Sequence, residues 1–133
     1  MNDKSTTKYD LEDRTARFGE DVIMFCKKLK KDSVSNPLIS QIVRSSTSVG
    51  ANYMEANSAS SKKDFRNKIH ICKKEVSETK HWLRMISVGM DENKEDARVL
   101  WREAQELTLI FGKIVSKLNN SDLIQNSKLE IQN

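Results

Sequence analysis

"FRNKIHICKKEVSETKHWLRMISVGM", residues 65–90, carries the most regular apolar pattern of the chain. Eight positions in it follow one another at alternating intervals of four and three residues, and seven of the eight are apolar. This spacing places all eight on one face of an α-helix. They are Phe65, Ile69, Cys72, Val76, Thr79, Leu83, Ile86 and Met90. Ser61 and Asp64 suit a capping box and Gly89 suits a C-terminal end, so the pattern predicts a helix over about residues 62–88.

Three other segments show the same alternation of intervals, and each predicts an amphipathic helix. The helix predicted over about residues 11–31 has its apolar face at Leu11, Thr15, Phe18, Val22, Phe25 and Leu29. The helix predicted over about residues 37–57 begins at Asn36-Pro37 and has its face at Leu38, Ile42, Ser45, Val49, Asn52 and Ala56. The helix predicted over about residues 93–118 has its face at Ala97, Leu100, Ala104, Leu107, Phe111, Ile114 and Leu118.

Four amphipathic helices with short connections predict an all-α fold, an antiparallel up-down-up-down four-helix bundle. The length of 133 residues suits a single domain. We expect the bundle to occupy residues 1–120, and we expect residues 121–133 to form a flexible C-terminal tail because they include few apolar residues. Apolar residues beyond the four faces, above all Trp82 and Trp101, also predict a subunit interface and hence a homo-oligomer.

Composition and the N-terminal sequence argue against several classes of protein. No apolar run approaches the roughly 20 residues that a membrane span requires. Residues 1–13 lack the apolar core of a signal peptide, so we expect a cytoplasmic protein without a membrane partner. Cys26 and Cys72 both lie at apolar helical positions and form no C-x-x-C pair. This favours reduced, packed thiols over a disulfide or a metal pair.

The positive charge of the chain is concentrated in one segment. The net charge is +4, and residues 61–90, with eight basic and three acidic groups, contribute +5. Seven residues of this segment repeat at intervals of three and four and form a stripe about 100° around the helix from the apolar face. This basic stripe consists of Lys63, Arg66, His70, Lys73, Ser77, Lys80 and Arg84.

A stripe of cations on a long helix can follow the phosphates of a nucleic acid. We predict nucleic-acid contacts at Lys63, Arg66, Lys73, Lys80 and Arg84. Few aromatic residues lie along the stripe, which favours contacts to the sugar–phosphate backbone over base stacking. The alternative is a solvated helix face that acidic residues of neighbouring helices partly neutralise.

The segment "SSTSVGANYMEA", residues 45–56, combines small and polar residues. A glycine in mid-helix costs about 1 kcal/mol relative to alanine, so we expect another helix to approach closely at Gly50. We also predict a structural polar network at helical spacing that would fix the register between helices or subunits. Its residues are Arg44, Ser48, Asn52 and Glu55. The alternative is a solvated polar face.

Two patterns resemble parts of catalytic sites but lack the other residues that such sites need. Glu78-x-x-His81 matches one element of di-iron bundles, which require a second copy and further inward carboxylates. The hydroxyls of residues 45–48 have no histidine near them in the sequence, and the chain contains no glycine-rich phosphate loop. We therefore expect no enzymatic activity, no cofactor, no metal ion and no small-molecule substrate.

The segments "SSTSVGANYMEA" and "SKKDFRNKIHICKKEVSETKHWL" closely resemble the four-helix-bundle family of 23S rRNA intervening-sequence proteins. "RTARFGEDVIMFCKKL" and "EAQELTLIFGKI" are similar to the first and last helices of that family, so the resemblance covers about residues 9–118. It implies an antiparallel bundle that assembles as a ring-like homopentamer. A related branch, the accessory variability proteins of diversity-generating retroelements, implies binding to reverse transcriptase and nucleic acid through a basic surface. By this resemblance, Ser48, Asn52 and Glu55 are signature residues with a structural role.

These observations favour a non-enzymatic, homo-oligomeric bundle that binds structured RNA or a ribonucleoprotein partner through the basic stripe. The alternative is a protein–protein interaction scaffold without nucleic-acid binding, which would use exposed tryptophan and methionine side chains for its contacts. A metal-dependent enzyme is the third class, and it would require stoichiometric iron or manganese.

Overall fold

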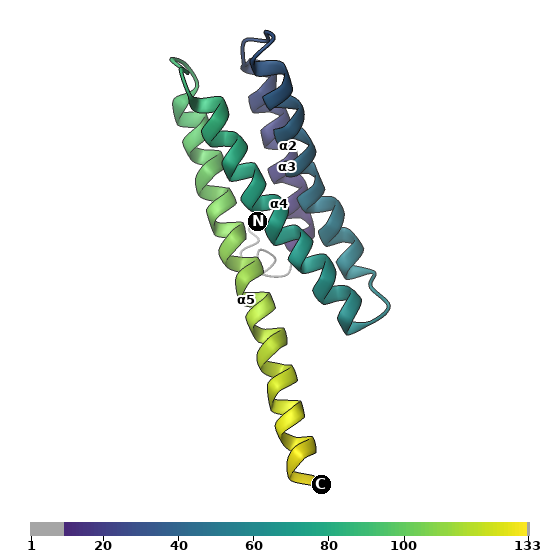
Figure 1. The fold of residues 1–133 in the computed structure, drawn as a ribbon. Coiled ribbons are helices and arrows are strands. Elements are labelled where there is room, and N and C mark those ends of the chain that lie inside the picture. The colour runs from purple at the N-terminus through teal and green to yellow at the C-terminus, as the bar shows by residue number, and fades with distance from the viewer. Residues whose placement is uncertain (1–9, 133) are drawn as a thin grey trace, which may run out of the picture.

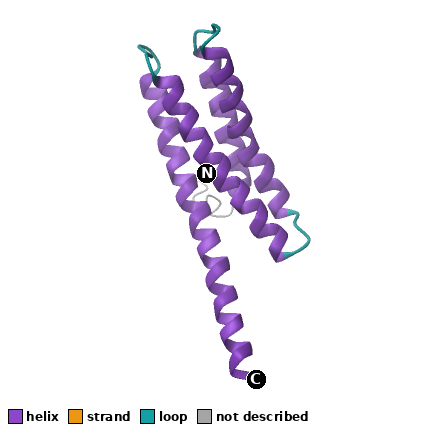
Figure 2. Cartoon of the chain, viewed as in Figure 1, coloured by secondary structure: helices purple, strands orange, loops and turns teal. Residues whose placement is uncertain are grey.

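The described part of the chain consists of four α-helices. A computed structural model describes residues 10–132, with side chains as far as residue 127. The helices are α2 (Leu11–Lys28), α3 (Ser35–Asn57), α4 (Lys62–Ser87) and α5 (Lys94–Gln132) (Figures 1 and 2). Residues 10–132 contain no β-strand, so the predicted all-α class is confirmed. None of the described helices has an apolar stretch of the length that crossing a bilayer requires.

The helices pack in the order in which they follow one another along the chain. α3 packs against α2 and α4, α4 packs against α5, and a smaller contact joins α2 to α5. Figure 1 shows the α2–α3 and α4–α5 connections at one end of the molecule and the α3–α4 connection toward the other. α4 therefore has α3 on one side and α5 on the other, and these two helices supply the neighbours of its charged residues.

The core lies along the apolar faces that the sequence spacing marks. Its most deeply buried apolar side chains come from all four helices and include Phe18, Val22, Ile42, Val49, Ile69, Cys72, Val76, Leu107 and Phe111. Thr15, Ser45 and Thr79, which occupy positions on the same faces, are fully buried as well. The hydroxyl oxygens of Ser45 and Thr79 lie 2.8 Å apart and form a hydrogen bond between α3 and α4. The hydroxyls of Ser45 and Thr79 are thus paired inside the core.

α4 begins and ends close to its predicted bounds. The Ser61 side chain caps it, because its Oγ accepts a hydrogen bond from the backbone N–H of Asp64 at 3.0 Å. At the other end, Gly89 has a φ of +74°, which a glycine adopts without strain. Ser61 and Gly89, from which the sequence predicted the two ends of this helix, therefore lie at those ends in the structure.

The connection between α2 and α3 differs from the prediction. α3 begins at Ser35 and not at Asn36-Pro37, because a carboxylate oxygen of Asp32 accepts hydrogen bonds from the backbone N–H groups of Val34 (2.9 Å) and Ser35 (2.8 Å). α2 ends at Lys28, three residues before its predicted end. Lys31 then donates hydrogen bonds of 2.8 and 3.0 Å to two carbonyl oxygens near the end of α2, which satisfies groups that a longer helix would have paired.

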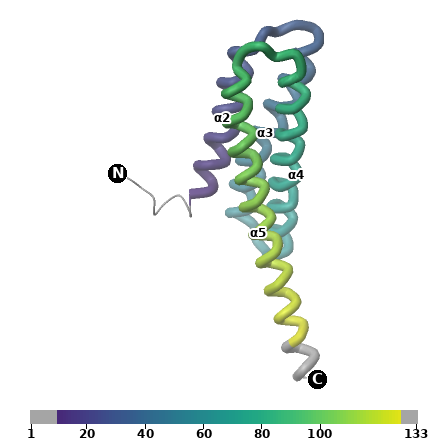
Figure 3. Tube along the Cα trace, turned by 90° about the vertical axis from the view of Figure 1, so that its left-hand side faces the viewer, coloured from purple at the N-terminus to yellow at the C-terminus, as the bar shows by residue number. Residues whose placement is uncertain are grey.

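α5 is longer than predicted. We expected it to end near residue 118, but the helix continues to Gln132, and Asn133 lies outside the described residues. The flexibility expected for residues 121–133 stays a prediction. Figures 1 and 3 show the C-terminal part of α5 projecting beyond the other three helices. Lys62 and Arg66 of α4 both form ion pairs with Asp122, which supports the helix past residue 118, where we had placed its end.

Candidate nucleic-acid interface

The basic stripe runs along an exposed side of α4. Lys63, Lys73 and Arg84 are exposed, and among the described side chains no carboxylate lies within ion-pair distance of them. His70 and Ser77, which lie between them on the stripe, are exposed too. These three cations are therefore accessible to an anionic partner along most of the length of α4.

Arg66 is less accessible than the prediction assumed. Its guanidinium forms an ion pair with Asp122 of α5, and its side chain is 25% exposed. The Nζ of Lys62 lies 3.2 Å from the other carboxylate oxygen of the same aspartate. The hydrogen bond from Lys62, together with the charge of Arg66, lowers the pKa of Asp122 below its ordinary value. An RNA phosphate would have to compete with this carboxylate for Arg66.

The structure brings α5 into the same surface. Lys80 donates a hydrogen bond of 2.7 Å to a glutamine side chain of α5, and its Nζ lies 5.3 Å from the centre of the Trp101 ring. Lys94 and Arg98 precede Trp101 at intervals of four and three residues, and all three line one groove together with Arg84. We call this surface the α4–α5 edge, and it consists of Lys63, Lys73, Lys80, Arg84, Lys94, Arg98 and Trp101.

We did not predict the α5 part of this edge. Residues 91–120 carry five basic and six acidic groups, and this nearly neutral total conceals how the charges are arranged around the helix. The four-three spacing of Lys94, Arg98 and Trp101 was the available signal. A count of charge by helix face, made for each helix, would have found it.

The acidic residues of α5 that face α2 are paired there. Arg14 of α2 binds Glu103 through two hydrogen bonds of 2.7 and 2.8 Å and reaches Glu106 at 2.9 Å. The hydrogen bonds with Glu103 raise the pKa of the Arg14 guanidinium above its ordinary value. Lys28 of α2 lies 2.9 Å from Asp96. Because α2 engages these three carboxylates, they do not compensate the positive charge of the α4–α5 edge, where Glu95 lies within ion-pair distance of Arg98.

Two glycines allow the backbones of α2 and α3 to approach each other. A Cβ on Gly50 would lie 3.3 Å from backbone atoms of Thr15 and Ala16, and a Cβ on Gly19 would lie 3.3 Å from the Cα of Thr47. Both distances are shorter than most contacts that a Cβ makes. The close approach predicted at Gly50 is thus confirmed, and Gly19 supplies the matching small residue on α2.

Comparison with known proteins shows the family of the chain and a solved structure of similar fold. The family model of the 23S rRNA-intervening sequence proteins matches residues 7–113. The chain belongs to the 23S rRNA-intervening sequence protein family. It is also similar to the crystal structure of a protein of unknown function from the S23 ribosomal protein family of Bacteroides thetaiotaomicron. That match has 29% sequence identity and a TM-score of 0.70, and it covers 78% of this chain and 96% of the other. No match was found among curated proteins.

In this member of the 23S rRNA-intervening sequence protein family, Arg44 connects α3 to α4. Its guanidinium donates hydrogen bonds to both carboxylate oxygens of Glu75, at 3.2 and 3.4 Å, and to Glu78 at 2.5 Å. Glu75 is 8% exposed, which makes it a buried carboxylate that we did not predict. Its position one residue before Val76 on the apolar face was the only hint in the sequence.

The other three residues of the predicted polar network do not join Arg44 through their side chains. Ser48 donates a hydrogen bond of 2.7 Å to the backbone carbonyl of Arg44, and Asn52 donates one of 2.8 Å to that of Ser48. Glu55 forms an ion pair of 2.7 Å with Lys68 on α4. The predicted polar network is thus divided into two separate ion-pair contacts with α4, at Arg44 and at Glu55, and two local hydrogen bonds along α3.

The residues of the two catalysis-like patterns are placed apart or in other contacts. Glu78 is engaged by Arg44, while the exposed His81 stacks edge-on against Trp82, with ring centres 4.9 Å apart. Within the described residues, no group of three potential metal-ligating side chains comes together. The hydroxyls of residues 46–48 all donate to backbone carbonyl oxygens of their own helix. These side chains therefore serve local packing in the positions that the structure gives them.

Both cysteines are buried free thiols, as predicted. Burial raises the pKa of Cys26 to about 11 and that of Cys72 to about 12. Because the thiolate is the reactive form, both side chains are chemically inert near neutral pH. The Sγ of Cys72 lies 3.6 Å from the carbonyl oxygen of Val49, so it behaves as a core residue between α3 and α4.

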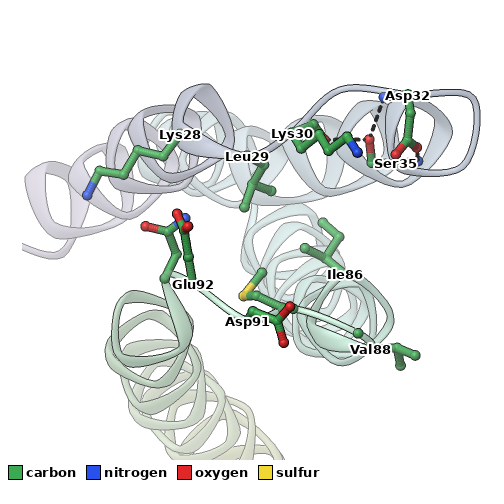
Figure 4. Close-up of a pocket in the computed structure, with 12 residues that line it drawn as sticks. Lys28, Leu29, Lys30, Asp32, Ser35, Ile86, Val88, Asp91 and Glu92 are labelled. Atoms are coloured by element: carbon green, nitrogen blue, oxygen red, sulfur yellow. Dashed lines mark hydrogen bonds between the residues drawn. The ribbon is translucent and has the colours of Figure 1, made fainter.

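A hollow of about 590 Å³ lies at the end of the molecule where the α2–α3 and α4–α5 connections meet (Figure 4). Leu29 and Ile86 contribute apolar side chains, while Lys28 and Glu92 bring opposite charges to its rim. Its charged groups are of both signs and come mainly from loops. The hollow therefore lacks the uniform positive charge of the α4–α5 edge, which we consider the stronger candidate interface.

Proposed function

We propose that this chain is a cytoplasmic, non-enzymatic, homo-oligomeric helical-bundle protein that binds structured RNA or a ribonucleoprotein partner. The observation that carries the proposal is the α4–α5 edge, where cations from two helices lie on one surface and three α5 carboxylates, Asp96, Glu103 and Glu106, pair with α2 instead. The family description, which refers to 23S rRNA, supports an RNA partner. Each phosphate contact contributes through the release of counterions, so the binding should depend strongly on salt.

The experiment that tests this proposal compares two variants of equal charge. Lys63→Gln/Lys73→Gln/Arg84→Gln removes three accessible cations of the edge, while Lys27→Gln/Lys113→Gln/Lys117→Gln removes three exposed cations elsewhere. With a stable RNA hairpin as the probe, the first variant should reduce the salt slope by about 1 for each lost phosphate contact. The second variant should bind nearly as the wild type does. Equal slopes for all three proteins would rule out the α4–α5 edge as the RNA surface.

We further propose that the chain forms an antiparallel bundle that assembles as a ring-like homopentamer. Several exposed apolar residues on α2, α3 and α5 support an interface between copies, namely Ile23, Met24, Met54, Val99 and Leu109. Ile23 and Met24 belong to α2, and Met54 and Val99 line hollows beside α2, away from the basic stripe. An assembly through these residues would leave the α4–α5 edge free and repeat it around the ring.

The same exposed apolar residues also favour the second candidate function, a protein–protein interaction scaffold. Scaffold binding would rest on buried apolar area and would persist at high salt, whereas phosphate contacts weaken steeply. Co-purification of a protein that survives both nuclease treatment and high salt would favour the scaffold. Loss of the bound material under either treatment would favour the RNA-binding function.

A further inference from the structure

We infer that the α4–α5 groove at Trp101 binds an unpaired nucleotide of an RNA strand, with the base stacked on the indole and the flanking phosphates on the surrounding cations. This inference rests on the proposed RNA-binding function and adds to it the kind of RNA site that is recognised. The groove has a volume of about 330 Å³. It is lined by Leu83, Arg84, Ser87, Lys94, Ala97, Arg98 and Trp101.

The groove has the composition of a nucleotide site. Its volume lies at the lower end of the roughly 300–1,000 Å³ that small-molecule pockets occupy. Leu83 and Ala97 give it an apolar base, while the cations Arg84, Lys94 and Arg98 surround it and no carboxylate belongs to its lining. Such a mixture suits a ligand that has one flat apolar part and one anionic part, as a nucleotide does.

Trp101 provides the flat surface that a base requires. Its side chain remains 44% exposed although it stands in a groove between two helices. Lys80 lies over the ring at 5.3 Å and is itself held by a hydrogen bond of 2.7 Å to Gln105, which limits the freedom of both side chains. Stacking on such a ring contributes roughly 5- to 150-fold in affinity per base and tolerates any base identity.

The cations around the ring are accessible to phosphates. Arg84 and Lys94 are exposed, and among the described residues neither forms an ion pair. Arg98 touches Glu95 at 3.4 Å, and Arg102 touches the same carboxylate at 3.5 Å, on side chains that are 63–67% exposed. Exposed contacts of this length contribute little, so a phosphate can replace them.

The geometry favours an unpaired nucleotide over a duplex. A base inside a duplex is stacked on both of its faces and paired along its edge. It therefore has no free face for an indole that stands between two protein helices. A loop, bulge or strand end exposes such a face. The remaining cations of the edge, Lys63 and Lys73, continue along α4 and would contact the adjoining backbone of the same RNA.

Tryptophan fluorescence of the full-length chain tests this inference directly. Trp82→Phe leaves Trp101 as the single tryptophan, and this substitution is mild because, among the described side chains, the buried Nε1 of Trp82 has no hydrogen-bond partner to lose. A short oligouridylate should quench the Trp101 emission. An inorganic polyphosphate and a long RNA duplex should bind with little quenching, because the polyphosphate has no base and nearly every base of the long duplex is stacked on both faces.

Affinity measurements with Trp101 variants complete the test. Trp101→Ala should weaken oligouridylate binding at least about fivefold and leave duplex affinity and the salt slope unchanged, because a ring is lost and no charge is. Trp101→Phe should keep most of the affinity. Ile124→Ala, at a 58% exposed position of the same helix outside the groove, serves as the control and should change neither affinity.

Four results would overturn the inference and distinguish its failure from that of the proposed function. Trp101→Ala that binds oligouridylate as the wild type does would refute the stacking site, while RNA binding itself would stand. Equal quenching by polyphosphate, or an equal loss of duplex affinity in Trp101→Ala, would also refute it. Failure of the wild type to bind any of the RNA probes would remove the proposed function and the inference together.

Discussion

Arg44 compensates a carboxylate that the fold has placed out of contact with water. Glu75 is 8% exposed, and its two oxygens accept hydrogen bonds from the Arg44 guanidinium. A buried charge of this kind is tolerated when a partner of opposite charge is present and becomes costly when the partner is removed. Arg44 therefore stabilises the fold mainly because it avoids a buried, unpaired carboxylate at Glu75. The ion pair itself contributes less, since the Arg44 side chain is half-exposed.

We predict that Arg44→Ala lowers the free energy of unfolding by about 1–3 kcal/mol, because it leaves the Glu75 carboxylate buried and unpaired. Urea denaturation followed by circular dichroism measures this change. Adding Glu75→Gln to the variant should restore part of the loss, since the uncompensated charge is then gone. Arg17→Ala is the control, because Arg17 forms only a surface ion pair within α2, worth at most about 1 kcal/mol. Equal effects of Arg44→Ala and Arg17→Ala would contradict the compensating role of Arg44.

Asp122 weakens the proposed RNA surface, because it forms ion pairs with Lys62 and Arg66, which a phosphate would otherwise bind. We predict that Asp122→Asn raises RNA affinity about 2- to 10-fold and makes the salt slope steeper, since Lys62 and Arg66 become available. A binding titration at several salt concentrations measures both. Asp91→Asn, an acidic loop position away from α4's basic stripe, is the control of equal charge. A gain in affinity of the same size in both variants would show a general effect of net charge.

The pKa of Asp122 fixes the pH range of this competition. Its pKa is lowered in the folded protein, so the pairing with Lys62 and Arg66 is fully present above the ordinary pKa of an aspartate. It is lost only as the pH falls through the lowered folded-state value. Asp122 should therefore stay paired with Arg66 at every pH in the neutral range, and its effect on RNA affinity can be measured only by substituting it.

At the scale of helices, the close contact between α2 and α3 requires a glycine at position 50, whereas the surroundings of Gly112 in α5 do not require one. A Cβ on Gly50 would meet backbone atoms of Thr15 and Ala16 at 3.3 Å, and backbone cannot move aside as a side-chain end can. At Gly112 of α5, by contrast, an added Cβ would have no described atom of a neighbouring element within 4 Å. The two residues are both in helix interiors, so their intrinsic helix propensities are the same and their surroundings differ.

We predict opposite signs for substitutions at these two glycines. Gly112→Ala should stabilise the protein by about 0.5–1 kcal/mol, the difference in helix propensity. Gly50→Val should destabilise it by about 1–3 kcal/mol, because the larger side chain forces α2 and α3 apart. Thermal and urea denaturation of both variants give the two values. A stable Gly50→Val variant would mean that the α2–α3 approach is not a constraint on this fold.

The helices themselves were largely predictable, because the position of each apolar residue in a helix is fixed by its own segment. The four faces, the Ser61 cap and the close approach at Gly50 all follow from local spacing and local chemistry. The extent of α5 was not predictable in this way. Its continuation past residue 120 is supported by contacts from Lys62 and Arg66, which are distant in sequence.

The candidate interface was only partly predictable for the same reason. Spacing placed Lys63, Lys73 and Arg84 on one exposed side of α4, but it carried no information on which residues α5 would bring beside them. Trp101 therefore entered the sequence reasoning as a candidate subunit contact, whereas the structure sets it in a groove of cations. Likewise, the predicted polar network was split because Arg44 and Glu55 meet different residues of α4, while Ser48 and Asn52 donate to backbone carbonyl oxygens of α3.

At the scale of the whole molecule, the charged and apolar surfaces lie on different sides. Met24 of α2 is 58% exposed and lines a hollow of about 250 Å³ with Val99 of α5, whereas the cations of the basic stripe lie along α4. Contacts between copies through the α2 side would bury apolar area without burying unpaired charge. This separation is what allows assembly and RNA binding to be proposed for one small chain.

We predict a molar mass of about 77 kDa by light scattering, which corresponds to five copies of the 15.3-kDa chain. Met24→Glu should lower this mass without loss of helical content, because it places a charge in the proposed contact and in no core position. Val88→Glu, at a 77% exposed loop position, should leave the mass unchanged. A wild type that runs as a monomer at micromolar concentration would exclude the ring.

The projecting end of α5 gives the molecule a direction. One end consists of two helix–loop–helix connections, and at the other a single helix extends past its neighbours (Figure 1). In a ring whose axis runs along the bundles, rotation about that axis would keep this direction, so every projecting helix would emerge on the same face. Such a ring would have two unlike faces, one of loops and one of separate helices. A large partner that approaches along the axis would then distinguish front from back by shape before it meets any charge.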